Sequence, residues 1–281
     1  MKALLSLAAS LAFTVGALAA EKQPVNAGPY VPSPTSVVAD MLTLAQVSAS
    51  DYVVDLGSGD GRIVLTAAKV FGARGFGVDI NPKLVKEANE AAKAQGIADR
   101  ASFHVQDLFK TDISKATVVT MYLLPDTVQM LRDKLLTELR PGARILSHDY
   151  GLNGWMPEKS ITMDLEDKVA ISGVTTTILY LYMVPAKIDG RWSASLPPAL
   201  GRTPVPIEFS TQRVTRVMGR ASLGGKEAIV EDGAMHGETL TFRLIANAKP
   251  YDFTGKVKDG RIEGTVSGGG TTAPWSAVPA K

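Results

Sequence analysis

The stretch DYVVDLGSGDGR, residues 51–62, decides the fold of this chain. It opens with a short, β-branched apolar run, 52–56, which is typical of a buried strand. Glycines follow at positions 57, 59 and 61, and helical spacing of apolar residues begins after Arg62. The stretch therefore predicts a strand, a glycine turn and a helix. Because glycine has no Cβ, such a turn lets the backbone approach a ligand closely.

The same alternation of strand and helix continues along the chain. A run at 75–78 ends in Asp79, and Asn81-Pro82 then provides a helix N-cap and a proline at the first helical position. We expect helices at 62–71, 82–95 and 126–140, and further strands at 101–105, 117–123 and 143–148. This order predicts an α/β fold with a parallel sheet covered by helices on both faces. Two later extended runs, 161–165 and 175–183, surround Gly173 and are compatible with an antiparallel hairpin in that sheet.

Ligands of such sheets bind beyond the carboxyl ends of the strands, where the glycine turn lies. Asp79, 22 residues after Gly57, is expected at the tip of the second strand, where its carboxylate can accept hydrogen bonds from ribose hydroxyls. Asp107 follows the third strand and can accept from an adenine amino group, although a turn or helix-cap role is the alternative. A nicotinamide dinucleotide site is disfavoured, because Arg62 stands where the G-x-G-x-x-G fingerprint requires its last glycine.

Several of these segments resemble known methyltransferases. VDLGSGDG at 54–61, Asp79 and Gln106-Asp107 resemble the cofactor half of the seven-strand, S-adenosylmethionine-dependent methyltransferases. PYVP at 29–32 and DLF at 107–109 narrow the resemblance to the small protein-lysine methyltransferase family whose mitochondrial members modify the c-ring protein of ATP synthase and the adenine nucleotide translocase. The resemblance covers about residues 29–157. It implies a Rossmann-like seven-stranded sheet and S-adenosylmethionine as the cofactor.

The resemblance also assigns roles to individual residues. The residues expected to hold the cofactor are Tyr30, Asp55, Gly57, Gly59, Gly61, Asp79 and Asp107. Of these, the aspartate at 55 and the glycines would surround the methionine portion, the aspartate at 79 the ribose, and the aspartate at 107 the adenine. YLLP at 122–125 occupies the position after the fourth strand from which such enzymes shape the acceptor pocket.

Transfer to a lysine requires a neutral amine, which costs roughly 4–5 kcal/mol at pH 7 for an unperturbed pKa of about 10.4. Residues that could lower this cost are Tyr122 and Pro125 of the YLLP segment, His148 and Asp149 at the end of the fifth strand, and the aromatic rings of Tyr30 and Trp155. For Tyr122 the alternative is a half-buried strand aromatic, and for His148 a packed strand end. Tyr30 and Trp155 are either pocket walls or simple packing.

Residues 1–20 have the pattern of a leader: Lys2 is followed by an uncharged run rich in leucine and alanine that reaches Ala20. Ala17-Leu18-Ala19 matches a small-x-small cleavage site, so we expect a signal peptide and a periplasmic protein. The alternative is an uncleaved leader that anchors the protein to the extracytoplasmic face of a membrane.

The chain has no cysteine, and its three histidines are 44 and 88 residues apart, so a thiolate or histidine metal centre is not expected. A net charge of +2 does not suggest a nucleic-acid partner.

The character of the chain changes near residues 185–190. Residues 21–185 contain 16 Lys/Arg and 19 Asp/Glu, whereas 186–281 contain 13 and 9 and have repeated glycine turns between alternating runs. We therefore expect a signal peptide at 1–20, an N-terminal segment and helix at 21–50, a methyltransferase domain at 51–185 and an antiparallel β meander or barrel at 186–281. Aromatic residues expected in the core of the second domain are Trp192, Phe209, Phe242, Phe253 and Trp275.

These observations leave two classes of function. The first is a methyltransferase that uses S-adenosylmethionine to modify a protein lysine, so its partner would be a protein with an accessible lysine. A small-molecule acceptor is the alternative within this class. The second class is an exported, non-catalytic binding or scaffold protein that keeps the methyltransferase fold.

Overall fold

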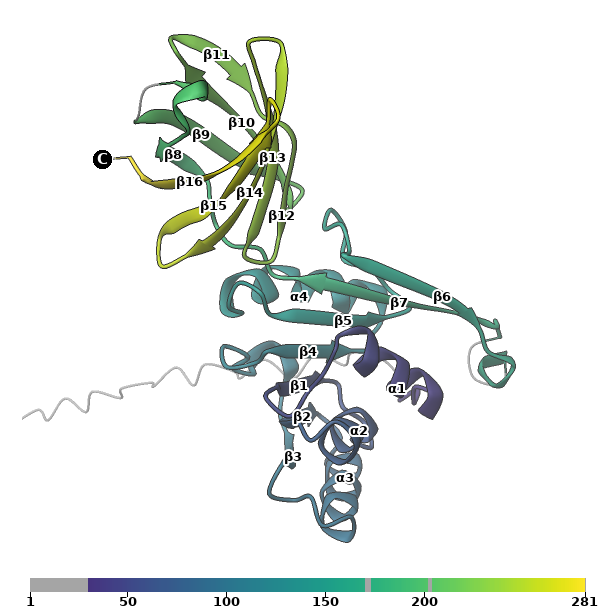
Figure 1. Cartoon of the computed structure of the whole chain (residues 1–281). Coiled ribbons are helices and arrows are strands. Elements are labelled where there is room, and N and C mark those ends of the chain that lie inside the picture. Colours follow the sequence, from purple (N-terminus) through teal and green to yellow (C-terminus); the bar gives the residue numbers. More distant parts are fainter. Residues whose placement is uncertain (1–29, 170–172, 202–203, 281) are drawn as a thin grey trace, which may run out of the picture.

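The computed structural model describes residues 30–169, 173–201 and 204–280, so the leader predicted at 1–20 lies outside the described residues. The chain builds two sheets, one covered by helices and one closed into a barrel (Figure 1). None of the helices in the described ranges combines the length and the apolar character needed to cross a bilayer.

The first sheet has seven strands in the order β3-β2-β1-β4-β5-β7-β6. Their bounds are β1 (Tyr52–Leu56), β2 (Arg74–Asp79), β3 (Ala101–Val105), β4 (Val118–Met121), β5 (Arg144–His148), β6 (Lys159–Asp164) and β7 (Thr176–Met183). Strands β1 to β5 are parallel, and β7 runs antiparallel to both β5 and β6. The predicted Rossmann-like sheet and its antiparallel hairpin are both confirmed.

Helices cover both faces of this sheet. They are α1 (Thr35–Leu44), α2 (Arg62–Val70), α3 (Pro82–Ala94) and α4 (Pro125–Glu138). Because successive side chains of a strand point to opposite faces, Val53 packs in one cluster with α1 and α2, whereas Val54 packs in another with α4. Helix α4 begins at Pro125, one residue before the predicted start, because proline suits the first helical position.

The second sheet has nine antiparallel strands and closes through the pairing of β9 with β10. The strands are β8 (Gly190–Ser195), β9 (Val205–Gln212), β10 (Arg216–Leu223), β11 (Lys226–Ile229), β12 (Glu231–His236), β13 (Thr239–Ala246), β14 (Lys249–Lys258), β15 (Arg261–Gly268) and β16 (Thr271–Pro279). The closed ring contains eight of them, since β11 pairs only with β10. All five aromatic residues predicted for this core are buried. At its centre the Phe242 and Phe253 rings stack at 4.5 Å, and Trp275 meets both edge-on.

The barrel joins the first sheet at the amino-terminal end of β5. The backbone N–H of Gly142, two residues before β5, donates to Val184 O at 2.8 Å, and Ala186 N donates to Gly237 O of the barrel at 2.8 Å. An ion pair links His236 Nδ1 to Glu158 Oε2 at 2.8 Å. The glycine turn after β1 lies at the carboxyl ends of the parallel strands, so the barrel and this turn are at opposite ends of the sheet (Figure 1).

Candidate functional site

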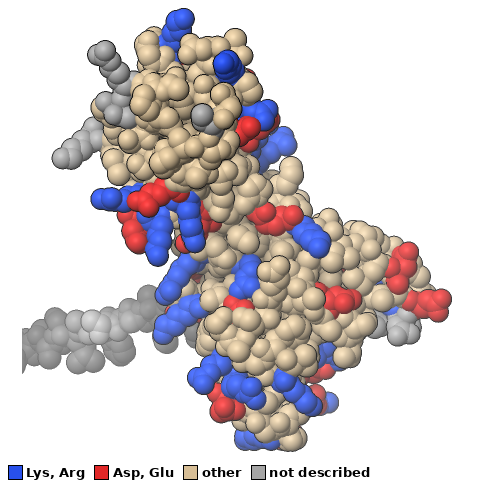
Figure 2. Space-filling view, viewed as in Figure 1, with Lys and Arg blue, Asp and Glu red and all other residues tan. Residues whose placement is uncertain are grey.

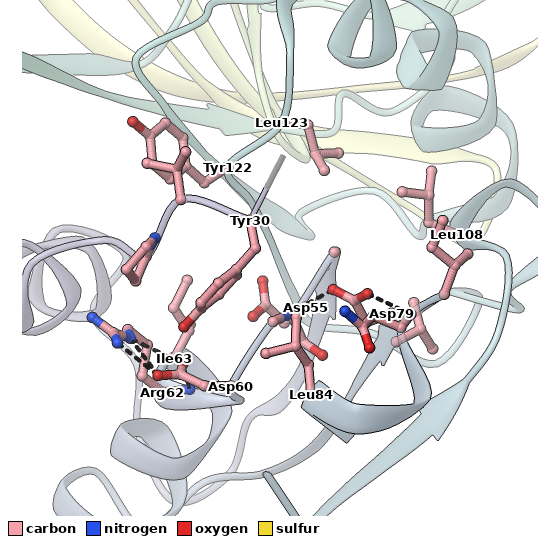
Figure 3. Close-up of a pocket in the computed structure, with 18 of the residues that line it drawn as sticks. Tyr30, Asp55, Asp60, Arg62, Ile63, Asp79, Leu84, Leu108, Tyr122 and Leu123 are labelled. Atoms are coloured by element: carbon pink, nitrogen blue, oxygen red, sulfur yellow. Dashed lines mark hydrogen bonds and ion pairs between the residues drawn. The ribbon is translucent and has the colours of Figure 1, made fainter. Parts of the chain in front are cut away.

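A pocket of about 290 Å³ opens at the carboxyl ends of β1, β2 and β4 (Figure 3). Its walls come from the segment 30–33, the glycine turn and the start of α2, residues 78–84 at the end of β2 and beyond it, the start of the turn after β3, and Tyr122-Leu123 after β4. Segments distant in sequence therefore meet where the parallel strands end, as a doubly wound sheet predicts.

Two glycines of the turn line the pocket and contribute no side chains to it. Gly57 has φ +83°, and a Cβ there would lie 2.6 Å from Leu123 Cδ2. Gly59 has φ +52°, and its Cβ would lie 2.4 Å from Tyr30 Cε2. Both positions require glycine for conformation and for space.

Gly61 has a packing role in the structure. It does not line the pocket, and a Cβ at this position would lie 2.6 Å from the Phe103 ring and 2.8 Å from Ala88 Cβ. Gly61 therefore allows α2 and α3 to pack closely against β3. Its contribution to cofactor binding through direct contact remains a prediction.

Asp79 lies beside the glycine turn, as its spacing predicts. Its Oδ2 accepts from Gly59 N at 3.0 Å and its Oδ1 from Asn81 N at 2.9 Å (Figure 3). Ile80, Leu84 and Leu108 add apolar walls nearby. A carboxylate next to apolar walls suits a nucleoside, because the sugar offers hydroxyl donors and the base an apolar face.

Asp55 is a buried carboxyl at the bottom of the pocket, only 2% exposed. Thr120 Oγ1 donates to its Oδ1 at 2.7 Å. Burial raises the pKa of Asp55 to about 7, and the nearby charges of Asp79 and Asp60 act in the same direction. A ligand with a positive charge at this place would stabilise the ionised form. Ser58 Oγ, also buried at the pocket wall, has no hydrogen-bond partner within the described protein.

These features fit S-adenosylmethionine, which carries a sulfonium, an ammonium and a ribose. Gly57 and Gly59 would cradle the methionine portion, Asp55 would face its positive charges and Asp79 would accept from the ribose hydroxyls.

Asp107 does not line the pocket: its Oδ1 accepts from Phe109 N at 2.8 Å and caps the turn η1 (Leu108–Lys110). Its neighbours Gln106 and Leu108 do line the pocket, so contact of Asp107 with adenine remains a prediction.

Three of the residues proposed for acceptor chemistry form one cluster. Tyr122 lines the pocket, and its hydroxyl donates to Asp149 Oδ2 at 3.0 Å. The ring of Tyr122 stacks on His148 with centroids 3.9 Å apart. Burial raises the pKa of Tyr122 well above its usual value, and Asp149 raises it further. Tyr122 is therefore a neutral hydroxyl at physiological pH.

His148 lies behind this wall and is completely buried. Its Nδ1 is 2.9 Å from Ser33 Oγ, and burial lowers its pKa to about 4. The imidazole is thus neutral near pH 7 and is a weak base. His148, Asp149 and Pro125 are not among the residues that line the pocket, so direct catalytic roles for them remain predictions. Trp155 is not a pocket wall either, because it is buried in the core against Tyr182.

The segment 30–33 closes one side of the pocket. Arg62 Nη1 donates to Ser33 O at 2.6 Å, and Arg62 also pairs with Asp60 at 2.6 Å. Tyr30 covers Gly59, and burial together with Asp60 raises the pKa of its hydroxyl. In the sequence, Arg62 served only as evidence against a dinucleotide site. Its hydrogen bond from the glycine turn to the segment 30–33 was not predicted. The roles of Ser33 and Lys168, which reach the site from other segments, were not predicted either.

The chain has recognisable relatives. A family model described as the ANTKMT methyltransferase domain matches residues 55–159. A protein-lysine N-methyltransferase of Saccharolobus islandicus (strain REY15A) is 43% identical over 157 residues, which are 56% of this chain and 93% of the relative. The adenine nucleotide translocase lysine N-methyltransferase of Mus musculus is 37% identical over 129 residues, which are 46% of this chain and only 56% of the relative.

A solved structure matches the same part of the chain. It is titled a crystal structure of an RNA methyltransferase from Salinibacter ruber in complex with S-adenosyl-L-homocysteine. The two proteins are 47% identical, with a TM-score of 0.50, and the match covers 56% of this chain and 96% of the other.

Proposed function

Because the chain belongs to the protein-lysine N-methyltransferase family and is an S-adenosylmethionine-dependent methyltransferase, we propose that its acceptor is the side-chain amine of a lysine in a protein. The observation that carries this proposal is the convergence of Gly57, Gly59 and Asp79 in one pocket beside Tyr122. The likeness to a lysine methyltransferase over 93% of that relative supports the choice of acceptor.

The cofactor, when bound, supplies an electrophilic methyl group on a sulfonium. The chain has to align a neutral amine with that group and keep water away. Alignment of two reacting groups can contribute on the order of 7–11 kcal/mol. Tyr122 is placed for this task at the pocket wall. Because its O–H donates to Asp149, its oxygen lone pairs remain available to accept an N–H of the acceptor amine.

Cofactor binding is tested by titration calorimetry of S-adenosylmethionine into the wild type and the Asp79→Ala variant. Hydrogen bonds to a charged group contribute about 1.5–3 kcal/mol, so we expect the affinity to fall roughly 10- to 150-fold. Asp133→Ala on α4 is the control, because the Asp133 side chain is 90% exposed. No binding heat in the wild type at saturating cofactor would instead support the non-catalytic scaffold.

The acceptor is tested by incubating the enzyme with cofactor labelled in its methyl group and a cell-envelope extract. We expect label in protein and, after acid hydrolysis, in methyllysine. Label confined to low-mass compounds would support a small-molecule acceptor. Label in RNA alone would also contradict the lysine proposal, which is relevant because the Salinibacter ruber structure is titled an RNA methyltransferase.

We also propose that residues 1–20 export the protein, so that its substrate is a protein outside the cytoplasm. The support is the uncharged run after Lys2 and the Ala17-Leu18-Ala19 sequence. Cell fractionation with N-terminal sequencing of the mature protein tests this. Recovery of the intact N-terminus in the cytoplasmic fraction would contradict it.

A further inference from the structure

Asp149, at the carboxyl end of β5, is held in one position by its backbone. It adopts the left-handed conformation with φ +63°, and its N–H donates to Ile178 O at 2.7 Å. Ile178 N in turn donates to Asp149 Oδ1 at 3.2 Å. The carboxylate is only 13% exposed. Burial of a carboxylate with so little access to water is costly unless the carboxylate is paired and hydrogen-bonded.

Lys168 pairs with this carboxylate. It lies in the turn η2 (Glu166–Lys168), on the connection between β6 and β7. Its Nζ lies 2.7 Å from both Asp149 Oδ1 and Oδ2, and the lysine side chain is only 5% exposed. Nζ also donates to the backbone carbonyl of Thr176. The ammonium is thus directed at the carboxylate that accepts from Tyr122, and Tyr122 lines the pocket.

We propose that Lys168 is a positioning residue for methyl transfer: its ammonium holds Asp149 in place, and Asp149 holds the Tyr122 hydroxyl so that its lone pairs receive the acceptor amine. This proposal rests on the proposed function. Among the described residues, the charged or titratable groups around the Tyr122 hydroxyl and Asp149 include Lys168, His148 on β5, and Tyr150. Lys168 is linked to the Tyr122 hydroxyl through Asp149.

The test compares Lys168→Met with Lys168→Arg in the full chain, using whichever acceptor the wild type methylates. We expect Lys168→Met to lower kcat at least tenfold and to leave cofactor affinity within twofold of wild type. Lys168→Arg should restore most of kcat, because it keeps the charge. Lys159→Met is the matched control, since Lys159 is an exposed lysine on β6 of the same hairpin.

A further readout separates positioning from a purely structural role. In the Asp149→Asn background, Lys168→Met should change kcat less than threefold, because the charged group through which Lys168 acts is already removed.

Loss of one partner of a buried ion pair can prevent folding. If Lys168→Met does not fold, Lys168→Arg and the double variant, in which both charges are removed, carry the test. An equal loss of kcat in the wild-type and Asp149→Asn backgrounds would overturn the proposal. So would a lower KM with unchanged kcat in Lys168→Met, because Lys168 would then compete with the acceptor. Failure of the wild type to methylate lysine would refute only the proposed function, since the comparison among variants applies to any acceptor.

Discussion

Some ionisable side chains of the pocket are deeply buried. Asp55 shows this most clearly, because it accepts a hydrogen bond from the Thr120 hydroxyl and lies near two other carboxylates. Its unusual pKa makes the folded protein sensitive to pH in a direction opposite to that of an ordinary ion-paired aspartate. The cause is the cost of placing a negative charge where water cannot reach it.

The first prediction concerns this pH dependence. Folded Asp55 has a pKa of about 7, and an unfolded aspartate one of about 3.9. Between these values the native state binds more protons than the unfolded state, so the free energy of unfolding falls as the pH rises from about 4 to 7. We expect the stability of the wild type relative to Asp55→Asn to decrease across this range, as measured by urea denaturation.

His148 acts in the opposite direction, because its folded pKa of about 4 lies below the unfolded value of about 6.5. Its stabilising contribution is present above pH 6.5 and is lost as the pH falls towards 4. Both proteins contain His148, so its effect cancels in the comparison. Equal stability changes in the wild type and Asp55→Asn would show that Asp55 is ionised in the folded protein.

At the level of elements, the glycine turn and the helix after it serve two functions. The first part of the turn shapes the pocket, whereas its last glycine allows α2 to begin close to β3 and α3. Gly61 is the N-cap of α2 with φ +81°, and its carbonyl accepts from Leu65 N at 2.9 Å. Packing of the helix and ligand binding thus depend on neighbouring glycines for different reasons.

The second prediction compares Gly61→Ala with Gly96→Ala. Both glycines have positive φ, +81° and +69°, but a Cβ at Gly96 would meet no atom within 4 Å. Each of the two variants therefore carries the same cost of placing alanine in the left-handed conformation, about 1–2 kcal/mol. We expect Gly61→Ala to be less stable than Gly96→Ala by a further 1–3 kcal/mol or so, from overpacking, in chemical denaturation. Equal losses would show that the ring of Phe103 moves aside freely.

At the level of the whole molecule, the barrel lies at the amino-terminal end of β5, whereas the pocket lies at the carboxyl ends of β1, β2 and β4. Figure 2 shows Lys and Arg side chains interleaved with Asp and Glu on the side of the barrel facing the first sheet. The contacts between the two parts include the Glu158–His236 ion pair, the backbone hydrogen bond at Ala186, the close approach of Gly237 to Met183, and the packing of Val214 against the core of the first sheet. No pocket-lining residue among those described comes from the barrel.

The third prediction tests this separation with Gly237→Ala. A Cβ at Gly237 would lie 2.3 Å from the Sδ atom of Met183, which is the last residue of β7. Gly224→Ala is the control, because its φ of +57° is similar to the +59° of Gly237 and its Cβ would meet nothing within 4 Å. We expect Gly237→Ala to lower the Tm more than the control does. Cofactor affinity should stay within about twofold of wild type, and a tenfold loss would show that the junction is coupled to the pocket.

The local patterns of the chain were sufficient to predict most elements. The strand at Ala101–Val105 has the predicted bounds, and α3 begins at Pro82 with Asn81 capping it through Lys83 N, as predicted. The fourth strand is shorter than predicted, because Tyr122 and Leu123 turn into the pocket instead of continuing the sheet. Local sequence could not show this, since an apolar run has the same pattern in a strand and in a pocket wall.

The sequence by itself determined the strand, glycine turn and helix, the distance to Asp79, and the change to a β domain after residue 185. Each follows from backbone preferences and periodicity within a few consecutive residues. Only the tertiary structure placed Ser33 against His148, 115 residues away, and Lys168 against Asp149. These contacts depend on the register between β5 and β7 and on how the chain packs around them. Both are non-local, and so is the position of the barrel at the end of the sheet opposite the pocket.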